Sequence, residues 1–184
     1  MLFFEEYPNY TILIVINQEI ISIFILKNRN IFYFTYNILG DNMLLKYTDK
    51  ELDLCARLMR AEALGEGELG MLMVGNVIVN RAISNCLDFK NIRSITDVVY
   101  QNPGGFVGTN SNLFHSGKAT SKEKELAKRV LKGEYYYPAT NALWFYSPSG
   151  GDECKSTWFK QRNSGRYKNH CFYVPDPGVC NELY

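Results

Sequence analysis

The chain has 184 residues, of which 46% are hydrophobic and 21% are charged, and its formal net charge is +1. These proportions are typical of a globular protein and exclude a chain that is disordered, collagen-like or coiled-coil throughout. Because nucleic-acid-binding proteins usually carry a large basic excess, we expect no nucleic-acid partner. The length suits one domain, or one domain with an appendage.

The first 42 residues differ in composition from the rest of the chain. Ile, Phe, Tyr and Asn supply 24 of them, and the segment has a net charge of −2 against +3 for residues 43–184. Its longest apolar stretch, Ile12–Leu26, is interrupted by three polar residues at 17–19, which argues against a membrane span. Glu5 and Glu6 stand where a basic n-region would be needed, so no clear signal peptide is predicted.

Two interpretations of this N-terminal segment stay open. Ile20–Leu26 and Ile31–Tyr36 flank a turn-compatible stretch, which predicts a β-hairpin. Alternatively, the codons of its commonest residues are AT-rich, which suggests a mis-assigned start with Met43 as the candidate true start. In either case we divide the chain into an extension of doubtful origin, residues 1–42, and a domain, residues 43–184.

The domain opens with a helix that carries an unusual glutamate. Thr48 and Glu51 form a capping-box signal before an apolar run, so we predict a helix over about Asp49–Leu64, ended by Gly65. At about 100° per residue, Glu62 falls within the apolar arc of this helix and stands in its last turn.

A carboxylate in that position is desolvated, and desolvation raises its pKa. The C-terminal end of the helix acts in the same direction. A carboxylic acid with a raised pKa suits general-acid catalysis near neutral pH. The competing interpretation is a structural glutamate paired with Arg57, Arg60 or Arg81. Glu66, four residues beyond Glu62, is either a second carboxylate of the same site or a cap for the next helix.

A second helix is predicted over about Glu68–Ile83. Its sequence is apolar nearly all round, so we expect it to be central and buried. The polar residues Asn76, Asn80 and Arg81 then need partners, and a glutamate is the plausible partner for Arg81.

The five cysteines and two histidines limit the metal and disulfide chemistry of the chain. An odd number of cysteines argues against a closed set of intramolecular disulfides. Cys55 is interpreted as a small core residue, whereas Cys154, Cys171 and Cys180 could cross-link. No C-x-x-C pair occurs, so we predict no metal site and no cofactor.

The remaining predicted elements are a helix at Asn91–Tyr100, a loop at Gln101–Phe106, a helix at Lys122–Lys132 capped by Ser121, and two paired strands at Leu143–Tyr146 and Cys171–Val174. The region around the first strand is rich in aromatic residues, which either pack on the helices or bind the faces of sugars. Tyr146 and Trp158, on either side of a polar stretch, are candidate cleft residues.

These residues carry a family resemblance. The string Ala61–Glu66, A-E-A-L-G-E, within Leu54–Glu68 resembles the glutamate segment of the SleB/CwlJ cell-wall hydrolases. Further matching segments are Gly70–Arg81, Ile95–Gln101, Gly104–Phe106, Ala142–Ser147 and Asn169–Tyr173. The ordered set spans about Leu52–Val174, and its detail is more similar to the CwlJ branch, the spore cortex-lytic enzymes.

The resemblance implies a small α+β domain with a mainly helical, lysozyme-like core and a short antiparallel sheet. It implies cleavage of the glycan strands of peptidoglycan, in particular spore cortex containing muramic δ-lactam, during germination. The implied chemistry is similar to that of a lytic transglycosylase, in which one glutamate protonates the glycosidic oxygen and the muramic 6-hydroxyl closes an anhydro ring. The matching glutamate here is Glu62.

Gln101 and Phe106 match family positions near the cleft, and the alternatives for them are a loop hydrogen bond and a core anchor. Together with Glu66 and the aromatic candidates Tyr146 and Trp158 they are expected to contact substrate, with Asn80 and Arg81 in support. The implied location is the boundary of spore coat and cortex, with coat proteins as candidate partners and no membrane attachment.

Two alternatives remain open. An N-acetylmuramoyl-L-alanine amidase of the usual type needs zinc with histidine and carboxylate ligands, and two histidines without paired spacing argue against it. A non-catalytic, glycan-binding coat protein would keep the fold, and the intact Glu62 argues against that.

Overall fold

The computed structural model describes residues 2–7, 10–16, 20–27, 30–37 and 44–183. The chain forms two compact units, Met1–Asn42 and Met43–Tyr184. Met43, the candidate start, lies outside the described residues.

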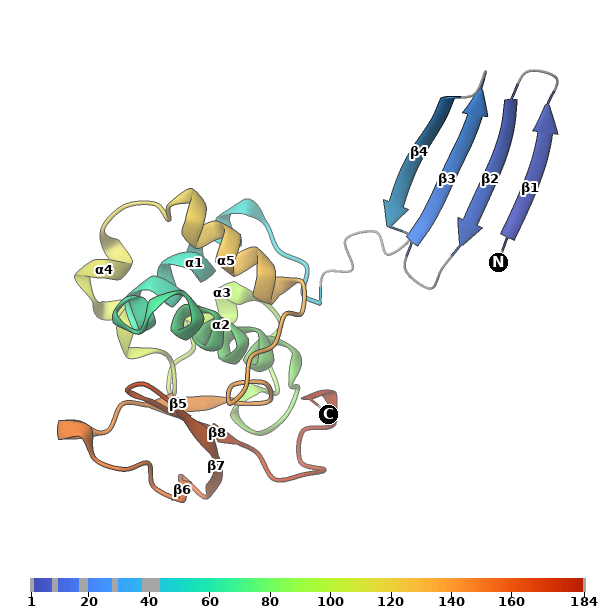
Figure 1. The fold of residues 1–184 in the computed structure, drawn as a ribbon. Coiled ribbons are helices and arrows are strands. Elements are labelled where there is room, and N and C mark those ends of the chain that lie inside the picture. Colours follow the sequence, from blue (N-terminus) through green and yellow to red (C-terminus); the bar gives the residue numbers. More distant parts are fainter. Residues whose placement is uncertain (1, 8–9, 17–19, 28–29, 38–43, 184) are drawn as a thin grey trace. The chain divides into compact units, whose positions relative to one another are not determined.

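The first unit is a four-stranded antiparallel sheet in the order β1-β2-β3-β4 (Figure 1). Its strands are β1 Leu2–Tyr7, β2 Tyr10–Ile16, β3 Ile20–Lys27 and β4 Asn30–Asn37. The predicted hairpin is confirmed as β3 and β4, which pair from Ile20 opposite Asn37 to Lys27 opposite Asn30. The first hairpin, β1 and β2, was not predicted, although β-branched and aromatic residues favour strands there too.

The second unit has helices on one side and a small sheet on the other (Figure 1). Its helices are α1 Asp49–Ala63, α2 Gly67–Ile83, α3 Ile95–Val99, α4 Asn112–His115 and α5 Ser121–Leu131. Short 3-10 turns occur at Leu64–Glu66, Leu87–Phe89, Val107–Asn110, Ser149–Gly151 and Asn181–Leu183. The predicted α+β class is confirmed.

Helix α1 begins and ends close to the predicted residues. The hydroxyl of Thr48 accepts from the backbone of Glu51, and the Glu51 carboxylate accepts from the backbone of Thr48. This reciprocal cap satisfies amide groups at the start of the helix. The chain then passes through the Leu64–Glu66 turn directly into α2, so the end of α1 is held against the start of α2.

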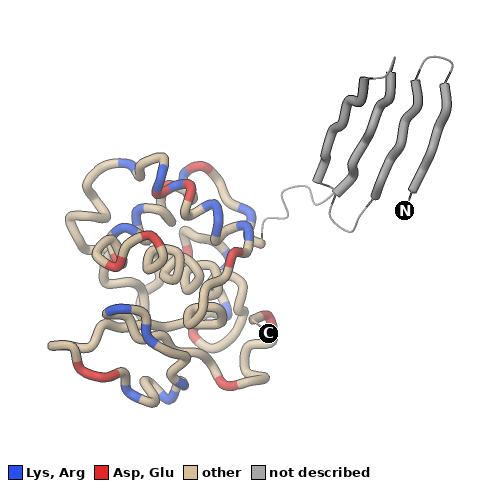
Figure 2. Tube along the Cα trace, viewed as in Figure 1, with Lys and Arg blue, Asp and Glu red and all other residues tan. Residues whose placement is uncertain are grey.

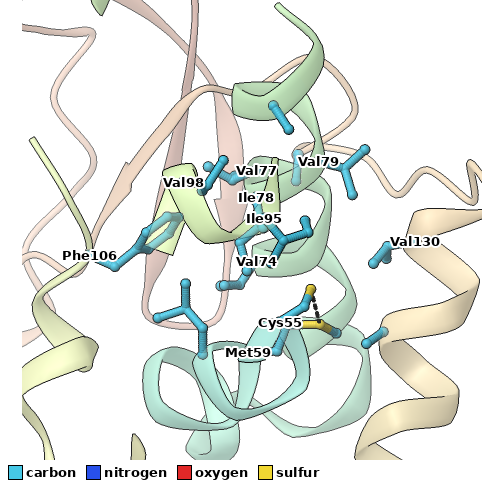
Figure 3. Packing of buried hydrophobic residues seen from close by; sticks show 14 of the residues in the cluster. Cys55, Met59, Val74, Val77, Ile78, Val79, Ile95, Val98, Phe106 and Val130 are labelled. Carbon is cyan, nitrogen blue, oxygen red and sulfur yellow. Dashed lines mark hydrogen bonds between the residues drawn. The ribbon is translucent and has the colours of Figure 1, made fainter. Parts of the chain in front are cut away.

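Helix α2 is the central helix, as predicted, and most of its residues are buried. Helix α5 packs closely on it at Gly75, which has no side chain: an added Cβ would lie 2.8 Å from Cγ2 of Val130. Figure 3 shows Val74, Val77 and Ile78 of α2 among the apolar side chains of α1, α3 and α5. The core therefore fixes α1, and the glutamate on it, against α2.

The sheet of this unit has the order β5-β8-β7-β6. Its strands are β5 Trp144–Tyr146, β6 Thr157–Trp158, β7 Gln161–Tyr167 and β8 His170–Val174. The predicted pairing of the first and last is confirmed, with Phe145 opposite Phe172. The polar strand β7 was missed because its sequence, QRNSGRY, lacks apolar alternation, and its register is irregular between Asn163 and Gly165.

Two predicted helix starts are corrected. The third helix begins at Ile95 instead of Asn91, because the Ser94 hydroxyl caps it by accepting from Asp97. The fifth helix is capped by Thr120 instead of Ser121, since the Thr120 hydroxyl accepts from the backbone of Glu123.

The odd number of cysteines wrongly argued against a closed set of intramolecular disulfides. Two disulfides form, Cys86–Cys180 and Cys154–Cys171, and the fifth cysteine is the buried Cys55. Burial raises the pKa of the Cys55 thiol to about 12, so it behaves as a core residue, as predicted. Cys86 was not among the predicted cross-linking residues.

Charge and hydropathy add two observations. Lys and Arg are interspersed with Asp and Glu on both the helical and the sheet side of the second unit (Figure 2). In the part of the chain that the structure describes, no helix has the length and apolar character needed to cross a bilayer.

Candidate active site

A cleft of about 810 Å³ opens between the helical side and the sheet of the second unit. Helices α1 and α2, the loop before α4 and strands β5 to β8 all contribute to it. The lining residues are Glu62, Arg81, Asp88, Phe89, Gln101, Gly104, Gly105, Phe106, Val107, Trp144, Phe145, Tyr146, Ser147, Trp158, Phe159, Gln161 and His170. Glu62, Arg81, Gln101, Phe106, Tyr146 and Trp158, predicted from widely spaced segments, therefore share one cavity.

Glu62 lies partly buried in the last turn of α1. Its Oε1 accepts a hydrogen bond of 2.5 Å from the backbone N–H of Gly108. Desolvation raises the pKa of this carboxyl above its ordinary value, and the Gly108 bond and the charge of Arg81 oppose the rise. A carboxyl group with a raised pKa in a cleft can deliver a proton to a bound molecule.

Arginine pairing does not account for Glu62. Arg57 pairs with Asp53, and Arg60 pairs with Glu123. Each of these two arginines also donates to carbonyls of the α4 region. Among the described residues no arginine is hydrogen-bonded to Glu62. The interpretation of Glu62 as a structural residue paired with an arginine therefore has no hydrogen-bonded pair to support it.

Arg81 is buried beside the cleft, where it holds two segments together. Its Nε donates to the carbonyl of Leu143 at 2.8 Å and its Nη1 donates to the carbonyl of Gly104 at 3.2 Å. The guanidinium also lies 4.2 Å from the ring centroid of Phe106. Burial lowers the pKa of Arg81 to about 10, so it stays charged at neutral pH. Backbone carbonyls, instead of the predicted glutamate, accept the hydrogen bonds of Arg81, and Glu62 interacts with Arg81 only through its charge.

The loop at Gln101–Phe106 forms one wall of the cleft. The side chain of Phe106 is buried against Arg81, and Gln101 donates to the carbonyl of Asp88 at 3.3 Å. The buried Oε1 of Gln101 has no hydrogen-bond partner in the described residues. The fold thus places both residues at the cleft.

Strands β5 and β6 contribute an aromatic part of the lining. The rings of Tyr146 and Trp158 lie 4.9 Å apart, and Tyr146 stacks on Tyr173 at 5.7 Å. Trp144 and Phe145, on the same strand, also line the cleft. Aromatic faces of this kind suit the apolar faces of sugar rings.

Glu66 and Asn80 lie outside the cleft lining. Both carboxylate oxygens of Glu66 accept hydrogen bonds from Asn169, at 2.9 and 3.2 Å, which ties the start of α2 to the β7–β8 turn. Glu66 occupies the position before α2, but its side chain does not cap that helix. The amide of Asn80 donates to the carbonyls of Ala139, Thr140 and Ala142 and so fixes the chain that leads into β5.

Sequence reasoning missed several cleft residues. Asp88 and His170 are polar groups from a short turn and a strand end, and Phe159 comes from the unpredicted β6–β7 hairpin. The signal for His170 was its place in the matching segment Asn169–Tyr173; for Asp88 the sequence offered none. Among residues 44–183, no group of three or more metal-ligating side chains is present.

Residues 65–173 match the family model described as Cell Wall Hydrolase. Two similar curated relatives are named cell wall hydrolase CwlJ. The protein from Oceanobacillus iheyensis is 52% identical over 140 residues, which cover 76% of this chain and 97% of the relative. The protein from Bacillus subtilis is 42% identical over 140 residues, covering 76% of this chain and 96% of the relative.

Among solved structures, this chain is similar to the catalytic domain of the germination-specific lytic transglycosylase SleB from Bacillus anthracis. The TM-score is 0.55 at 21% identity, covering 69% of this chain and 96% of that domain. This likeness confirms the predicted lysozyme-like fold. The family match and the identity to the curated relatives together establish that the chain belongs to the cell wall hydrolase family.

Proposed function

We propose that the protein cleaves the glycan strands of peptidoglycan, with Glu62 as the single general acid and base. The observation that carries this proposal is the position of Glu62: a carboxyl group of raised pKa, held on one oxygen by Gly108, inside an aromatic-walled cleft. Because Oε1 takes the Gly108 N–H, Oε2 is the oxygen left to carry and transfer a proton.

The proposed reaction needs one protein carboxyl group. Glu62 gives its proton to the glycosidic oxygen as the bond from that oxygen to the anomeric carbon breaks. The muramic 6-hydroxyl then attacks the anomeric carbon, and its proton returns to the Glu62 carboxylate. The product carries an anhydro ring, and the enzyme regains its starting protonation state without water or a cofactor.

Asp88 supports a second version of the chemistry. It is an exposed carboxylate in the lining of the same cleft, and glycoside hydrolases commonly use two carboxylates. In that version water replaces the 6-hydroxyl as the nucleophile, and the product is a reducing end. The single-carboxyl version is preferred because Asp88 is exposed, whereas Glu62 is shielded.

The biological setting proposed is the spore. The relatives are named for cell wall hydrolysis, and the similar solved structure is described as germination-specific. Cortex peptidoglycan with muramic δ-lactam is therefore the proposed substrate, germination the proposed occasion and the coat–cortex boundary the proposed location. Spore coat proteins are the proposed partners.

The test is product analysis on purified cortex with three proteins: the parent chain, Glu62→Gln and Glu68→Gln. Glu68 is an exposed α2 residue paired with Lys122, so its variant is a matched control. We expect Glu62→Gln to lose at least about 100-fold in rate, Glu68→Gln to match the parent, and mass spectrometry to find anhydro-muramic ends. Turnover by Glu62→Gln close to that of the parent would contradict the proposal. Release of stem peptides would favour the alternative activity, that of an N-acetylmuramoyl-L-alanine amidase.

A further inference from the structure

His170 is a buried imidazole that the proposed mechanism does not use. It begins strand β8, lines the cleft and is only 5% exposed. Within the described residues no protein group forms a hydrogen bond with either of its nitrogens, and Nδ1 is sealed from solvent. Because buried polar groups are nearly always hydrogen-bonded, an unpartnered one in a cleft wall calls for a functional explanation.

The surroundings keep this imidazole neutral. Burial lowers the pKa of His170 below its ordinary value, and the carboxylate of Glu66 only partly opposes this. The ring centroid of Phe145 lies 4.8 Å away and that of Phe172 lies 6.1 Å away, so the immediate wall is aromatic. A neutral imidazole carries one proton, on either Nδ1 or Nε2.

The sealed nitrogen decides which tautomer is present. Among buried backbone groups an N–H without an acceptor is rarer than an under-satisfied oxygen, and the same preference is applied here to the imidazole. A proton on Nδ1 would have no acceptor, whereas Nε2 is the nitrogen that is not sealed. The proton therefore belongs on Nε2, which makes His170, a residue of the cleft lining, a hydrogen-bond donor through its unsealed nitrogen.

We propose that His170 is a substrate-binding residue whose Nε2–H donates to an uncharged oxygen of the bound glycan. The inference rests on the proposed function of the cleft. Two kinds of sugar oxygen have this chemistry, a hydroxyl and the carbonyl of an N-acetyl group. Either would supply the acceptor that the protein itself does not provide.

The fold holds the imidazole in place for this role. Strand β8 is paired with β5 on one side and β7 on the other, and the next residue, Cys171, is disulfide-bonded to Cys154. The preceding Asn169 is bound by the carboxylate of Glu66. A donor fixed from three directions loses little freedom when substrate binds. Glu66 thus acts as a positioning residue for the turn that carries His170.

The test measures binding without turnover, in Glu62→Gln protein. A glutamine amide nitrogen approximates Nε2 of histidine, whereas an asparagine amide nitrogen approximates Nδ1. We therefore expect His170→Gln to keep the affinity for cortex fragments, and His170→Asn and His170→Phe to lose about 3- to 10-fold, the worth of one hydrogen bond. His115→Phe, which changes the exposed histidine of α4 outside the cleft lining, is the control.

Unchanged affinity in His170→Phe would overturn the inference while leaving the proposed function standing. Chitin and chitosan oligosaccharides separate the two oxygens: a His170 effect seen only with chitin identifies the N-acetyl carbonyl, and an equal effect identifies a hydroxyl. Nitrogen-15 NMR of the two imidazoles in the full chain reads the tautomer directly and does not depend on activity or on any variant folding. A proton on Nδ1 of His170 would contradict the inference even if cortex is cleaved.

Discussion

The backbone of Gly108 holds the carboxyl group of Glu62 at very close range. The N–H of Gly108 donates to Oε1 over 2.5 Å, and an added Cβ on Gly108 would lie 2.7 Å from that same oxygen. The carbonyl of Gly108 accepts from both the backbone and the hydroxyl of Ser111, so the turn itself is braced. The absence of a side chain at Gly108 is therefore what allows the carboxyl group to sit in its observed position.

We predict that Gly108→Ala reduces turnover about 10- to 100-fold with little loss of substrate binding. The methyl group displaces the Glu62 carboxyl, and small misplacements of a catalytic group cost rates of this order. The measurement is kcat and KM on cortex fragments. Gly65→Ala is the matched control, because a Cβ at Gly65 meets nothing within 4 Å, and it should behave as the parent. Equal rates for the two variants would refute this prediction.

The raised pKa of Glu62 makes a prediction about stability. In the folded state the Glu62 carboxyl keeps its proton to a higher pH than it does in the unfolded chain, where its pKa is 4.5. The folded state thus binds more protons in that window, and stability falls as pH rises through the raised pKa. Glu62→Gln removes this loss, so its advantage in melting temperature over the parent should grow from pH 4 to pH 7. A difference in melting temperature between the two proteins that stays constant from pH 4 to pH 7 would show that the pKa of Glu62 is not raised.

Part of this site could be predicted from sequence alone. Glu62 was identifiable because a helix of regular period placed one carboxylate on an apolar arc, and Tyr146 and Trp158 because aromatic residues flanked a polar stretch. These signals are local. Glu66 was also singled out locally, by its spacing of four residues from Glu62, yet its carboxylate is bound by Asn169, about a hundred residues further along the chain. Only the tertiary structure shows such a partner.

The elements missed from sequence have a common physical cause. Strand β7 is polar and only partly buried although it is an inner strand of the small sheet, so it shows neither apolar alternation nor a continuous apolar run. Asp88 enters the cleft from a three-residue turn after α2, and no periodic pattern positions it. The disulfides joined cysteines 94 and 17 residues apart, which spacing alone does not reveal.

Asp88→Asn separates the two versions of the chemistry. If the muramic 6-hydroxyl is the nucleophile, this variant should keep its turnover within about 3-fold of the parent and still yield anhydro ends, because a single carboxyl group does the proton transfers. If water is the nucleophile and Asp88 the base, turnover should fall by about 100-fold or more. The ratio of anhydro to reducing ends, measured by mass spectrometry, reports the answer independently of rate.

Arg81→Met is predicted to destabilise the fold by about 2 kcal/mol, because it leaves the buried carbonyl of Leu143 without its donor. The variant also removes a positive charge that lowers the pKa of Glu62. If enough protein folds to assay, activity should therefore persist to higher pH than in the parent. Arg93→Met, at an exposed arginine outside the cleft lining, is the control for both readouts. A pH profile unchanged in Arg81→Met would show that its charge does not act on Glu62.

The two disulfides should differ in what their removal changes. Cys86–Cys180 closes a separation of 94 residues, so replacing both with Ser should cost about 4 to 5 kcal/mol of stability by chain entropy. Cys154–Cys171 closes only 17 residues and should cost about 3 kcal/mol. However, it anchors the segment between Tyr146 and Trp158 to the strand that carries His170, so its removal should also weaken glycan binding. Denaturant melts and binding measured at equal folded fraction separate the two effects. A larger binding loss from the Cys86–Cys180 pair would contradict the assignment of the aromatic wall to substrate.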